Sequence, residues 1–277
     1  MPLAKTAEIV ADAYARGAGV ASLNVVLLEH ITAIIDAAEN RNRPVILQVS
    51  HNALRYHGSL GPIGSAMLAA AGNARVPVAV HLDHAESPEL VREAVALGFS
   101  SVMFDASTSD YAANVRATAG VVAHCHERDI WVEAELGEIG GKNGVHAPGA
   151  RTDPAEAARF VAATGVDALA VAVGTSHAML TRDAELDFGL IARLRAAVPV
   201  PLVLHGSSGV DDAGLGAAVR AGLTKINIAT RLNAALTAAA RRHIDAHPAV
   251  VDPRKYLGPA RAAVSAEIEH LLDVLGT

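Results

Sequence analysis

The stretch at positions 77–105 reads "PVAVHLDHAESPELVREAVALGFSSVMFD". Apolar runs at its two ends flank a segment with helical periodicity, which begins at Ser87-Pro88 and ends at Gly98. Serine followed by proline is a helix start signal, and glycine is a helix end signal. The stretch therefore predicts a strand, a helix and a second strand parallel to the first.

The same alternation runs along the whole chain, with short apolar runs separated by Ala-rich segments of helical periodicity. Eight such runs occupy positions 21–27, 44–50, 77–83, 100–105, 130–136, 167–174, 200–206 and 224–230. Eight units predict an α/β fold of the closed (β/α)8 type, a TIM barrel, because an open doubly wound sheet more often uses five or six strands.

Two further segments bracket the predicted barrel. We expect an extra N-terminal helix at about 5–16 and a C-terminal helical extension at about 259–274, from their apolar periodicity. The chain has no linker or compositional break, so residues 1–277 are expected to form a single domain. The longest irregular segment, 137–153, is rich in glycine and follows the fifth run. Loops of that length in compact folds are usually functional or mobile.

The composition limits the possible partners and compartment. A net charge of -6 with scattered arginines argues against a nucleic-acid partner. Cys125 is the single cysteine, so an internal disulfide is excluded and a reducing cytoplasm is expected. We expect no membrane span and no signal peptide, because no apolar stretch reaches about 18 residues and the N-terminal segment carries acidic side chains.

Polar side chains stand at the carboxyl ends of the predicted strands, where barrels of this kind carry their chemistry. They are Asn24, Gln48, Ser50, Asp83, His84, Asp105, Glu135, His177, His205, Asn227 and Thr230. A lone histidine is usually a surface or core residue, but three on one rim with carboxylates beside them favour a divalent cation. His84, His177 and His205 would leave a position open for substrate, as a catalytic zinc site requires.

Two further features belong to the same rim. His81 shares a strand face with Asp83, and we expect it to lie behind the metal or to fill the barrel. The segments "HGSSG" (205–209) and "NIAT" (227–230) end the last two strands, each just before a predicted helix. Backbone amides at this place form the usual phosphate site of the architecture.

Seven segments together carry a family resemblance. They read "HLDH", "SVMFD", "VEAELGEIGG", "GTSHA", "PLVLHGSSG", "KINIAT" and "DPRKYLGPAR". Over essentially its whole length the chain resembles the class II fructose-bisphosphate and tagatose-bisphosphate aldolases. The resemblance implies metal-dependent aldol cleavage of a ketose phosphate or bisphosphate into dihydroxyacetone phosphate and an aldehyde such as glyceraldehyde 3-phosphate.

The resemblance also implies roles for residues near the metal. It places the catalytic Zn²⁺, or another divalent ion, on the three histidines. Asp83 matches the acid that exchanges a proton with the aldehyde-derived oxygen, and Glu135 and Asp105 match carboxylates at an alternative or second metal position. Carbon–carbon cleavage beside a ketone leaves an enediolate, whose charge a Lewis acid stabilises.

Further residues match substrate contacts. The cradle for the ketose-derived phosphate, where Na⁺ or K⁺ is also bound, matches Gly206, Ser207, Ser208, Asn227, Ile228, Ala229 and Thr230. Asn24 and Ser50 match polar groups that face the substrate. Arg254 matches an arginine that reaches the far phosphate, in some members across a subunit interface; otherwise it is a surface arginine that caps the last helix. The likeness implies a homodimer or homotetramer in contact through the C-terminal helices.

The chain departs from the family after the fifth strand. Lys142 and Asn143 stand where a glutamate base and an aspartate are expected. Glu138 or His146 could replace that base, the substrate could differ, or activity could be lost. Elsewhere, Ala178 follows the second zinc histidine in place of glycine, and would be strained at a positive φ.

Three interpretations therefore remain open from the sequence. Ala229, which stands where one branch of the family has an acid, favours the tagatose-type branch. A Schiff-base aldolase would need a lysine in the site, for which Lys225 on the eighth strand is the candidate. A metal and sugar-phosphate binding protein without turnover is the non-enzymatic alternative.

Overall fold

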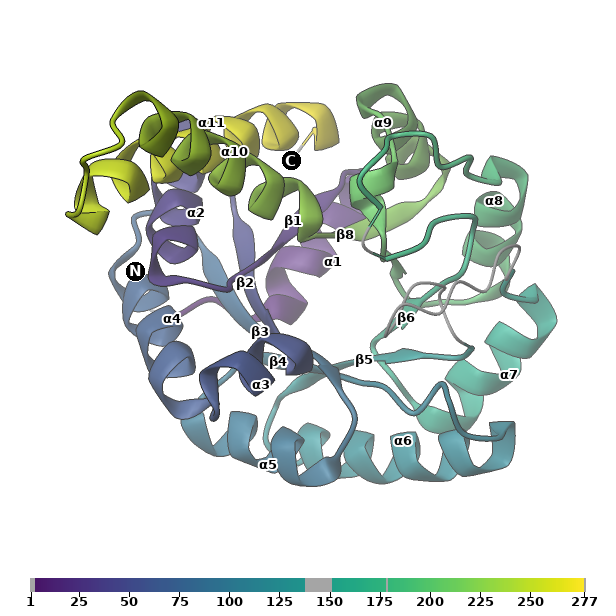
Figure 1. Ribbon diagram of the computed structural model, residues 1–277. Coiled ribbons are helices and arrows are strands. Elements are labelled where there is room, and N and C mark those ends of the chain that lie inside the picture. The colour runs from purple at the N-terminus through teal and green to yellow at the C-terminus, as the bar shows by residue number, and fades with distance from the viewer. Residues whose placement is uncertain (1–2, 138–150, 178, 277) are drawn as a thin grey trace.

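The computed structural model describes residues 3–137, 151–177 and 179–276. Eight parallel strands close into a barrel in the order β1-β2-β3-β4-β5-β6-β7-β8, and helices surround it (Figure 1). The strands are β1 Val20–Asn24, β2 Val45–Ser50, β3 Val78–Ala85, β4 Ser101–Phe104, β5 Trp131–Glu135, β6 Ala168–Ala170, β7 Leu202–Leu204 and β8 Leu223–Ile228. The predicted (β/α)8 barrel is confirmed.

The helices follow the start and end signals of the sequence. Ser87 and Asp153 cap α5 and α7, which run up to Gly98 and Gly165 as expected. The helices are α1 Thr6–Arg16, α2 Leu28–Arg41, α3 His51–His57, α4 Gly61–Asn73, α5 Pro88–Leu97, α6 Tyr111–His126, α7 Pro154–Thr164, α8 Phe188–Ala197, α9 Asp212–Ala221, α10 Thr230–Ala246 and α11 Pro253–Leu275, with a 3-10 turn η2 at Ser207–Gly209.

Several predicted boundaries differ from the structure by a few residues, and two differ most. The sixth strand was expected at 167–174 but ends at Ala170, because the backbone of Ala172 exchanges hydrogen bonds with Thr152 instead of a neighbouring strand. The last helix was expected at about 259–274 but begins at Pro253, behind the capping side chain of Asp252. The Asp-Pro pair is the true start signal, and Pro259 lies inside the helix.

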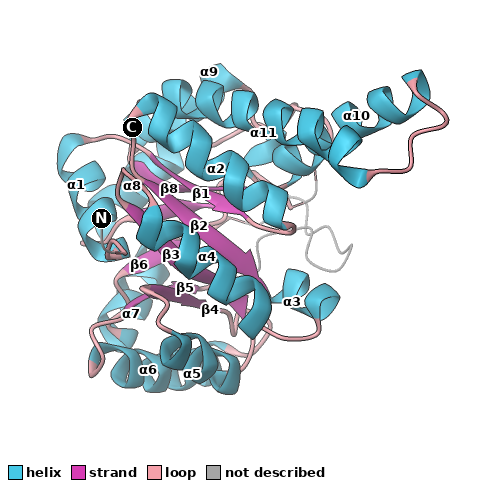
Figure 2. Cartoon of the chain, turned by 90° about the vertical axis from the view of Figure 1, so that its left-hand side faces the viewer, coloured by secondary structure: helices cyan, strands magenta, loops and turns pink. Residues whose placement is uncertain are grey.

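The two ends of the barrel have different roles. Helix α1 lies at the amino ends of the strands, where Ile9 and Val10 pack on an apolar layer that includes Ile46, Met103 and Trp131 (Figure 2). Beyond the carboxyl ends projects the hairpin formed by the end of α10 and the start of α11 (Figure 2). The carboxyl-end face is therefore the one left open to a ligand.

A layer of fully buried polar side chains lies inside the barrel, between the apolar layer under α1 and the open carboxyl-end face. Its members, each 0% exposed, are Ser22, Gln48, His81, Ser101, Glu133 and Lys225. Polar groups at this depth need partners inside the protein. Among the described helices, none combines the length and the apolar character needed to cross a membrane.

Candidate active site

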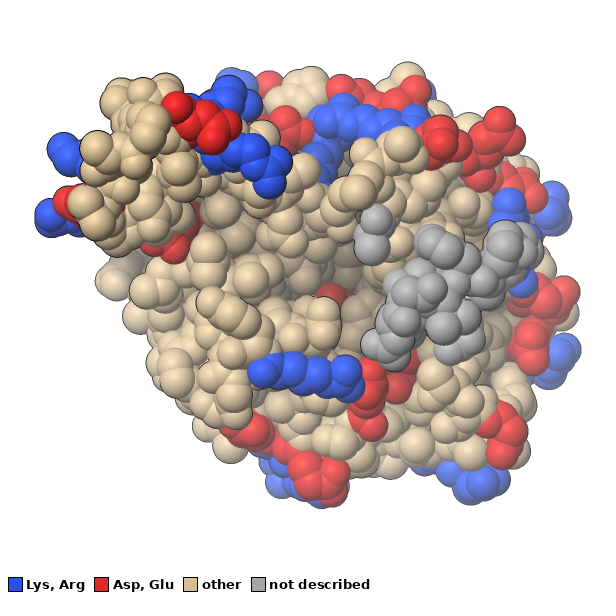
Figure 3. All heavy atoms as spheres, in the orientation of Figure 1, with Lys and Arg blue, Asp and Glu red and all other residues tan. Residues whose placement is uncertain are grey.

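The carboxyl-end face contains a pocket of about 260 Å³, seen as a hollow at the centre of the face (Figure 3). It collects most of the residues that the sequence singled out. Those that line it are Asn24, Ser50, Asp83, His84, Asp105, His177, His205, Gly206, Ser207, Ser208, Asn227, Ala229 and Thr230. Residues from β1, β2, β3 and β8 and from the segments after β4, β6, β7 and β8 thus meet at one place.

The three predicted metal ligands come together. The Nδ1 atom of His205 lies 2.9 Å from Nε2 of His84 and 3.4 Å from Nε2 of His177. A tetrahedral ion with nitrogen ligands at about 2.0–2.1 Å sets those nitrogens roughly 3.3 Å apart. The three imidazoles therefore present a set of nitrogens that fits one divalent ion.

His84 reaches this set through an irregularity in β3. The pairing of β3 with β4 shifts register between Leu82 and Ala85, where β3 carries one more residue than β4. His84 lies at this bulge with φ 51, in the left-handed region that few non-glycine residues adopt. In a regular strand Asp83 and His84 would point to opposite faces. The bulge lets both side chains line the pocket.

Carboxylates contact two of the histidine rings at the nitrogen that faces away from the other imidazoles. Oδ2 of Asp105 lies 2.8 Å from Nδ1 of His84, and Oδ1 of Asp105 accepts from the backbone and hydroxyl of Ser107. Oε1 of Glu133 lies 2.9 Å from Nε2 of His205. A carboxylate in this place keeps the proton on the nitrogen that faces it, so the opposite nitrogen offers its lone pair to a metal.

Burial keeps His205 in the neutral form that a metal ligand needs. The side chain is 1% exposed, and desolvation, followed by the neighbouring His84, holds the pKa of His205 well below its ordinary value. A neutral imidazole keeps a lone pair for coordination.

Asp83 stands beside the histidines and is held by Asn227. The side chain of Asp83 is 4% exposed, and its Oδ1 accepts a hydrogen bond of 3.1 Å from Nδ2 of Asn227. A carboxylate at this depth, facing the pocket, can exchange a proton with a bound hydroxyl group.

Asp105 and Glu135 form a second possible ligand group with His84, since one atom of each lies within 4.8 Å of the others. Glu135 is buried at the end of β5 and does not line the pocket. In this arrangement the carboxylate of Asp105 is engaged by His84, so the three-histidine set is the better fit for a single ion.

The turn after β7 has the geometry of a phosphate site. Gly206 adopts φ 67, and a Cβ atom there would lie 2.5 Å from the carbonyl oxygen of Ser176. The hydroxyl of Ser207 donates to the carbonyl of Asn227, which ties the turn to β8, and the hydroxyl of Ser208 accepts from the amide of Arg231. Helix α10 begins at Thr230 without a capping side chain. A helix start beside a small-residue turn favours an anion.

Some predicted residues lie elsewhere. The side chain of Ile228 packs in the core between barrel and helices, so only its backbone can serve the cradle. Arg254 does not line the pocket; it lies in the first turn of α11 with its side chain 88% exposed and paired with Asp252. Glu138, Lys142, Asn143, His146 and Ala178 lie outside the described residues.

Two residues of the site were not predicted from the sequence, Glu133 and Arg55. Glu133 has the same strand parity as Glu135, but nothing in its pattern marks it as the partner of His205. Arg55, in α3, is the only Lys or Arg among the described residues that line the pocket, and it pairs with Glu86 at 3.2 Å. Figure 3 shows basic and acidic side chains next to each other at the lower edge of the hollow.

Comparisons with known proteins agree with this geometry. The family described as fructose-bisphosphate aldolase class-II matches residues 4–277. A fructose-bisphosphate aldolase of Staphylococcus epidermidis is 39% identical over 281 residues, which cover 100% of this chain and 98% of the relative. One of Thermus caldophilus is 39% identical over 297 residues, covering 98% and 97%.

A solved structure adds a likeness in three dimensions. The crystal structure of the YdjI aldolase from Escherichia coli K12 matches with a TM-score of 0.88 at 35% identity, and the match covers 99% of this chain and 97% of that one. The chain belongs to the class II fructose-bisphosphate aldolase family, whose members are metal-dependent enzymes that carry out aldol cleavage of sugar phosphates.

Proposed function

We propose that this protein catalyses the reversible aldol cleavage of a ketose bisphosphate into dihydroxyacetone phosphate and an aldehyde phosphate, with Zn²⁺ held by His84, His177 and His205. The observation that carries the proposal is the meeting of three imidazole nitrogens beside the carboxylate of Asp83 in one pocket. The metal-dependent, sugar-phosphate chemistry of the family supports the reaction class. Fructose bisphosphate is the substrate named for the relatives of Staphylococcus and Thermus.

The ion supplies Lewis acidity, which stabilises the negative charge left on the ketone half when the carbon–carbon bond breaks. The side chains of the pocket do the rest. In cleavage, Asp83 accepts the proton of the hydroxyl on the aldehyde half as that oxygen becomes a carbonyl, and the electron pair of the broken bond moves to the ketone half. In condensation, Asp83 returns the proton. Asn227 holds the carboxylate in place through its 3.1 Å hydrogen bond.

The two ends of the substrate meet different parts of the pocket. The turn Gly206–Ser208 and the segment Asn227–Thr230 cradle the phosphate of the ketone half, and Na⁺ or K⁺ can share that site. Asn24 and Ser50 face the sugar. Among the described residues of one chain, Arg55 is the cation that lines the pocket and can meet the phosphate of the aldehyde half.

Arg254 is proposed to serve the pocket of a neighbouring subunit. It lies in the first turn of α11, directly after the turn 247–252 of the hairpin that projects past the carboxyl ends of the strands (Figure 2), and it lies outside the pocket of its own chain. An arginine there can complete a site only in a homodimer or homotetramer.

We place the protein in the cytoplasm, in keeping with its one cysteine. Cys125 is a buried thiol, and burial raises its pKa to about 11.

A second candidate rests on the loop acids replaced by Lys142 and Asn143. In that case the protein binds the metal and a sugar phosphate but turns over another ketose phosphate, or none. The test is a panel of fructose, tagatose and related ketose bisphosphates, together with release of tritium from labelled dihydroxyacetone phosphate. The proposal predicts cleavage of at least one bisphosphate and tritium release. Binding of dihydroxyacetone phosphate without either reaction would support the second candidate.

A further inference from the structure

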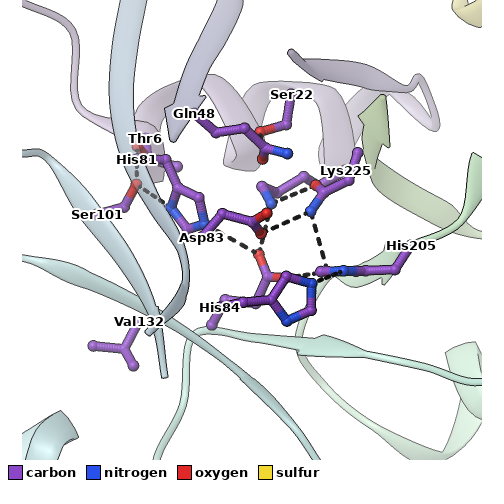
Figure 4. Close-up of polar contacts among 12 residues, drawn as sticks. Thr6, Ser22, Gln48, His81, Asp83, His84, Ser101, Val132, His205 and Lys225 are labelled. Carbon is purple, nitrogen blue, oxygen red and sulfur yellow. Dashed lines mark hydrogen bonds and ion pairs between the residues drawn. The ribbon is translucent and has the colours of Figure 1, made fainter. Parts of the chain in front are cut away.

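We propose that Lys225 is a positioning residue that acts through Glu133 and Asn227 to fix the metal ligand His205 and the acid Asp83. The inference rests on the proposed function of the pocket, but it concerns side chains beneath that pocket. Lys225 and Glu133 are each 0% exposed, and neither lines the cavity. Figure 4 shows Lys225, Asp83, His84 and His205 directed toward one another inside the barrel.

The ammonium group of Lys225 has two partners. Its Nζ lies 2.8 Å from Oε2 of Glu133 and donates to Oδ1 of Asn227 at 2.6 Å. A lysine ammonium can only donate. The side-chain amide of Asn227 must therefore turn its oxygen toward Lys225 and its nitrogen toward the pocket. That nitrogen is the atom that donates to Oδ1 of Asp83.

The second arm runs through Glu133 to the metal centre. Oε2 of Glu133 faces Lys225, and Oε1 faces Nε2 of His205 at 2.9 Å. An ionised carboxylate can only accept, so the proton of His205 lies on Nε2 and its Nδ1 is left for the ion. Nδ2 of Asn227 lies 3.2 Å from the same Nε2, but an amide nitrogen cannot accept a hydrogen bond. The Nε2 proton of His205 is therefore donated to Glu133.

Charge explains why this place needs a lysine. A buried carboxylate without a cation is strongly destabilising. The other basic group close to Glu133 in the described layer is His81, whose Nε2 lies 3.9 Å from Oε2. Burial and the charge of Lys225 hold the pKa of His81 well below its usual value, so His81 is neutral. Lys225 is therefore the cation that faces the buried carboxylate of Glu133, whose two oxygens are divided between Lys225 and His205.

The same contacts exclude the Schiff-base role considered for Lys225 from the sequence. An imine-forming lysine must reach the substrate carbonyl with its Nζ, but this side chain is 0% exposed and both of its contacts lie within the barrel. Lys225 acts on the reaction only through other side chains.

The test compares the wild type with Lys225→Met and the charge-balanced double variant Glu133→Gln/Lys225→Met. The double variant removes both charges of the pair, so it leaves no unpaired charge in the buried layer. It therefore serves as the test if the single variant fails to fold. Ile191→Ala, in α8 and away from the pocket, is the control for a general loss of stability. Three quantities are measured on folded protein: the zinc dissociation constant by chelator competition, kcat and KM, and the tautomer of His205 by ¹⁵N NMR of the metal-free chain.

We expect the double variant to bind zinc about 10- to 100-fold more weakly. We also expect a kcat at least about 10-fold lower with KM changed less than about threefold, because Lys225 touches no substrate. The NMR spectrum should change from one Nε2–H tautomer to a mixture. Ile191→Ala should melt at a lower temperature with zinc affinity and tautomer unchanged. The inference is overturned if the double variant keeps the tautomer, the zinc affinity and kcat of the wild type.

The wild type separates this inference from the proposed function. A wild-type protein that binds no zinc and cleaves no ketose phosphate would contradict the proposed function, yet the tautomer of metal-free His205 would still test the role of Lys225. Wild-type zinc binding and turnover, with a double variant that matches it in all three measurements, would contradict the role of Lys225 alone.

Discussion

Asp83 and His84 are consecutive residues of one strand, and both side chains line the same pocket because His84 lies at a β-bulge with φ 51. The irregularity sets the carboxylate proposed to exchange a proton directly beside one of the three convergent imidazoles. The two neighbours nevertheless have separate partners, Asn227 for Asp83 and Asp105 for His84. Their contributions can therefore be separated by substitution.

Asp83→Asn should abolish turnover while leaving the metal in place. The amide fills the same volume but cannot take up the proton of the substrate hydroxyl, so kcat should fall about 10²- to 10⁴-fold. Zinc content, measured by elemental analysis, should match the wild type because Asp83 is not one of the three proposed metal ligands. A variant with wild-type kcat, or one that loses its zinc, would contradict the division of roles.

Asp105→Asn should have the opposite pattern. The amide can no longer hold the Nδ1 proton of His84 as a carboxylate does, so zinc affinity should fall about 10- to 100-fold. Chelator competition measures the change, and excess zinc should restore much of the activity. An unchanged dissociation constant would show that the 2.8 Å contact has no part in metal binding.

Gly206→Ala should destabilise the protein more than Gly58→Ala. Both glycines have positive φ, 67 and 78, so each alanine pays the penalty of the left-handed region, about 1–2 kcal/mol. Only at Gly206 does the new Cβ meet backbone, 2.5 Å from the oxygen of Ser176, which adds about 1–3 kcal/mol. Denaturant unfolding of both variants measures the difference, and equal losses would contradict it.

Arg55→Ala should distinguish the two phosphates of the substrate. Arg55 comes from α3, after β2, whereas the proposed phosphate cradle follows β7 and β8. KM for a ketose bisphosphate should therefore rise about 10-fold, while KM for dihydroxyacetone phosphate in the tritium exchange should stay within about twofold. Arg92→Ala is the matched control, an exposed arginine of α5 paired with Glu89. Equal effects on both substrates would remove Arg55 from the aldehyde half.

The sequence predicts the barrel well because the hydrophobic periodicity and the helix start and end signals agree over the whole chain. In α5, for example, Ser87 caps the start and Gly98 ends the helix. It also brings the three histidines to one rim, since the carboxyl ends of parallel strands meet. It cannot reveal the bulge at His84, because alternation places Asp83 and His84 on opposite faces. It gives no signal for the pairing of Glu133 with Lys225 either, since β5 and β8 are not neighbours in the barrel and the two side chains meet only inside it.

Zinc removal tests the central claim most directly. The protein is loaded with zinc, its metal content is determined, and ketose bisphosphate cleavage is followed before and after dialysis against EDTA and after zinc is returned. Three convergent imidazoles predict close to one tightly bound ion per chain, loss of cleavage on dialysis and recovery on addition. Turnover that survives the removal of all divalent ions would contradict the account.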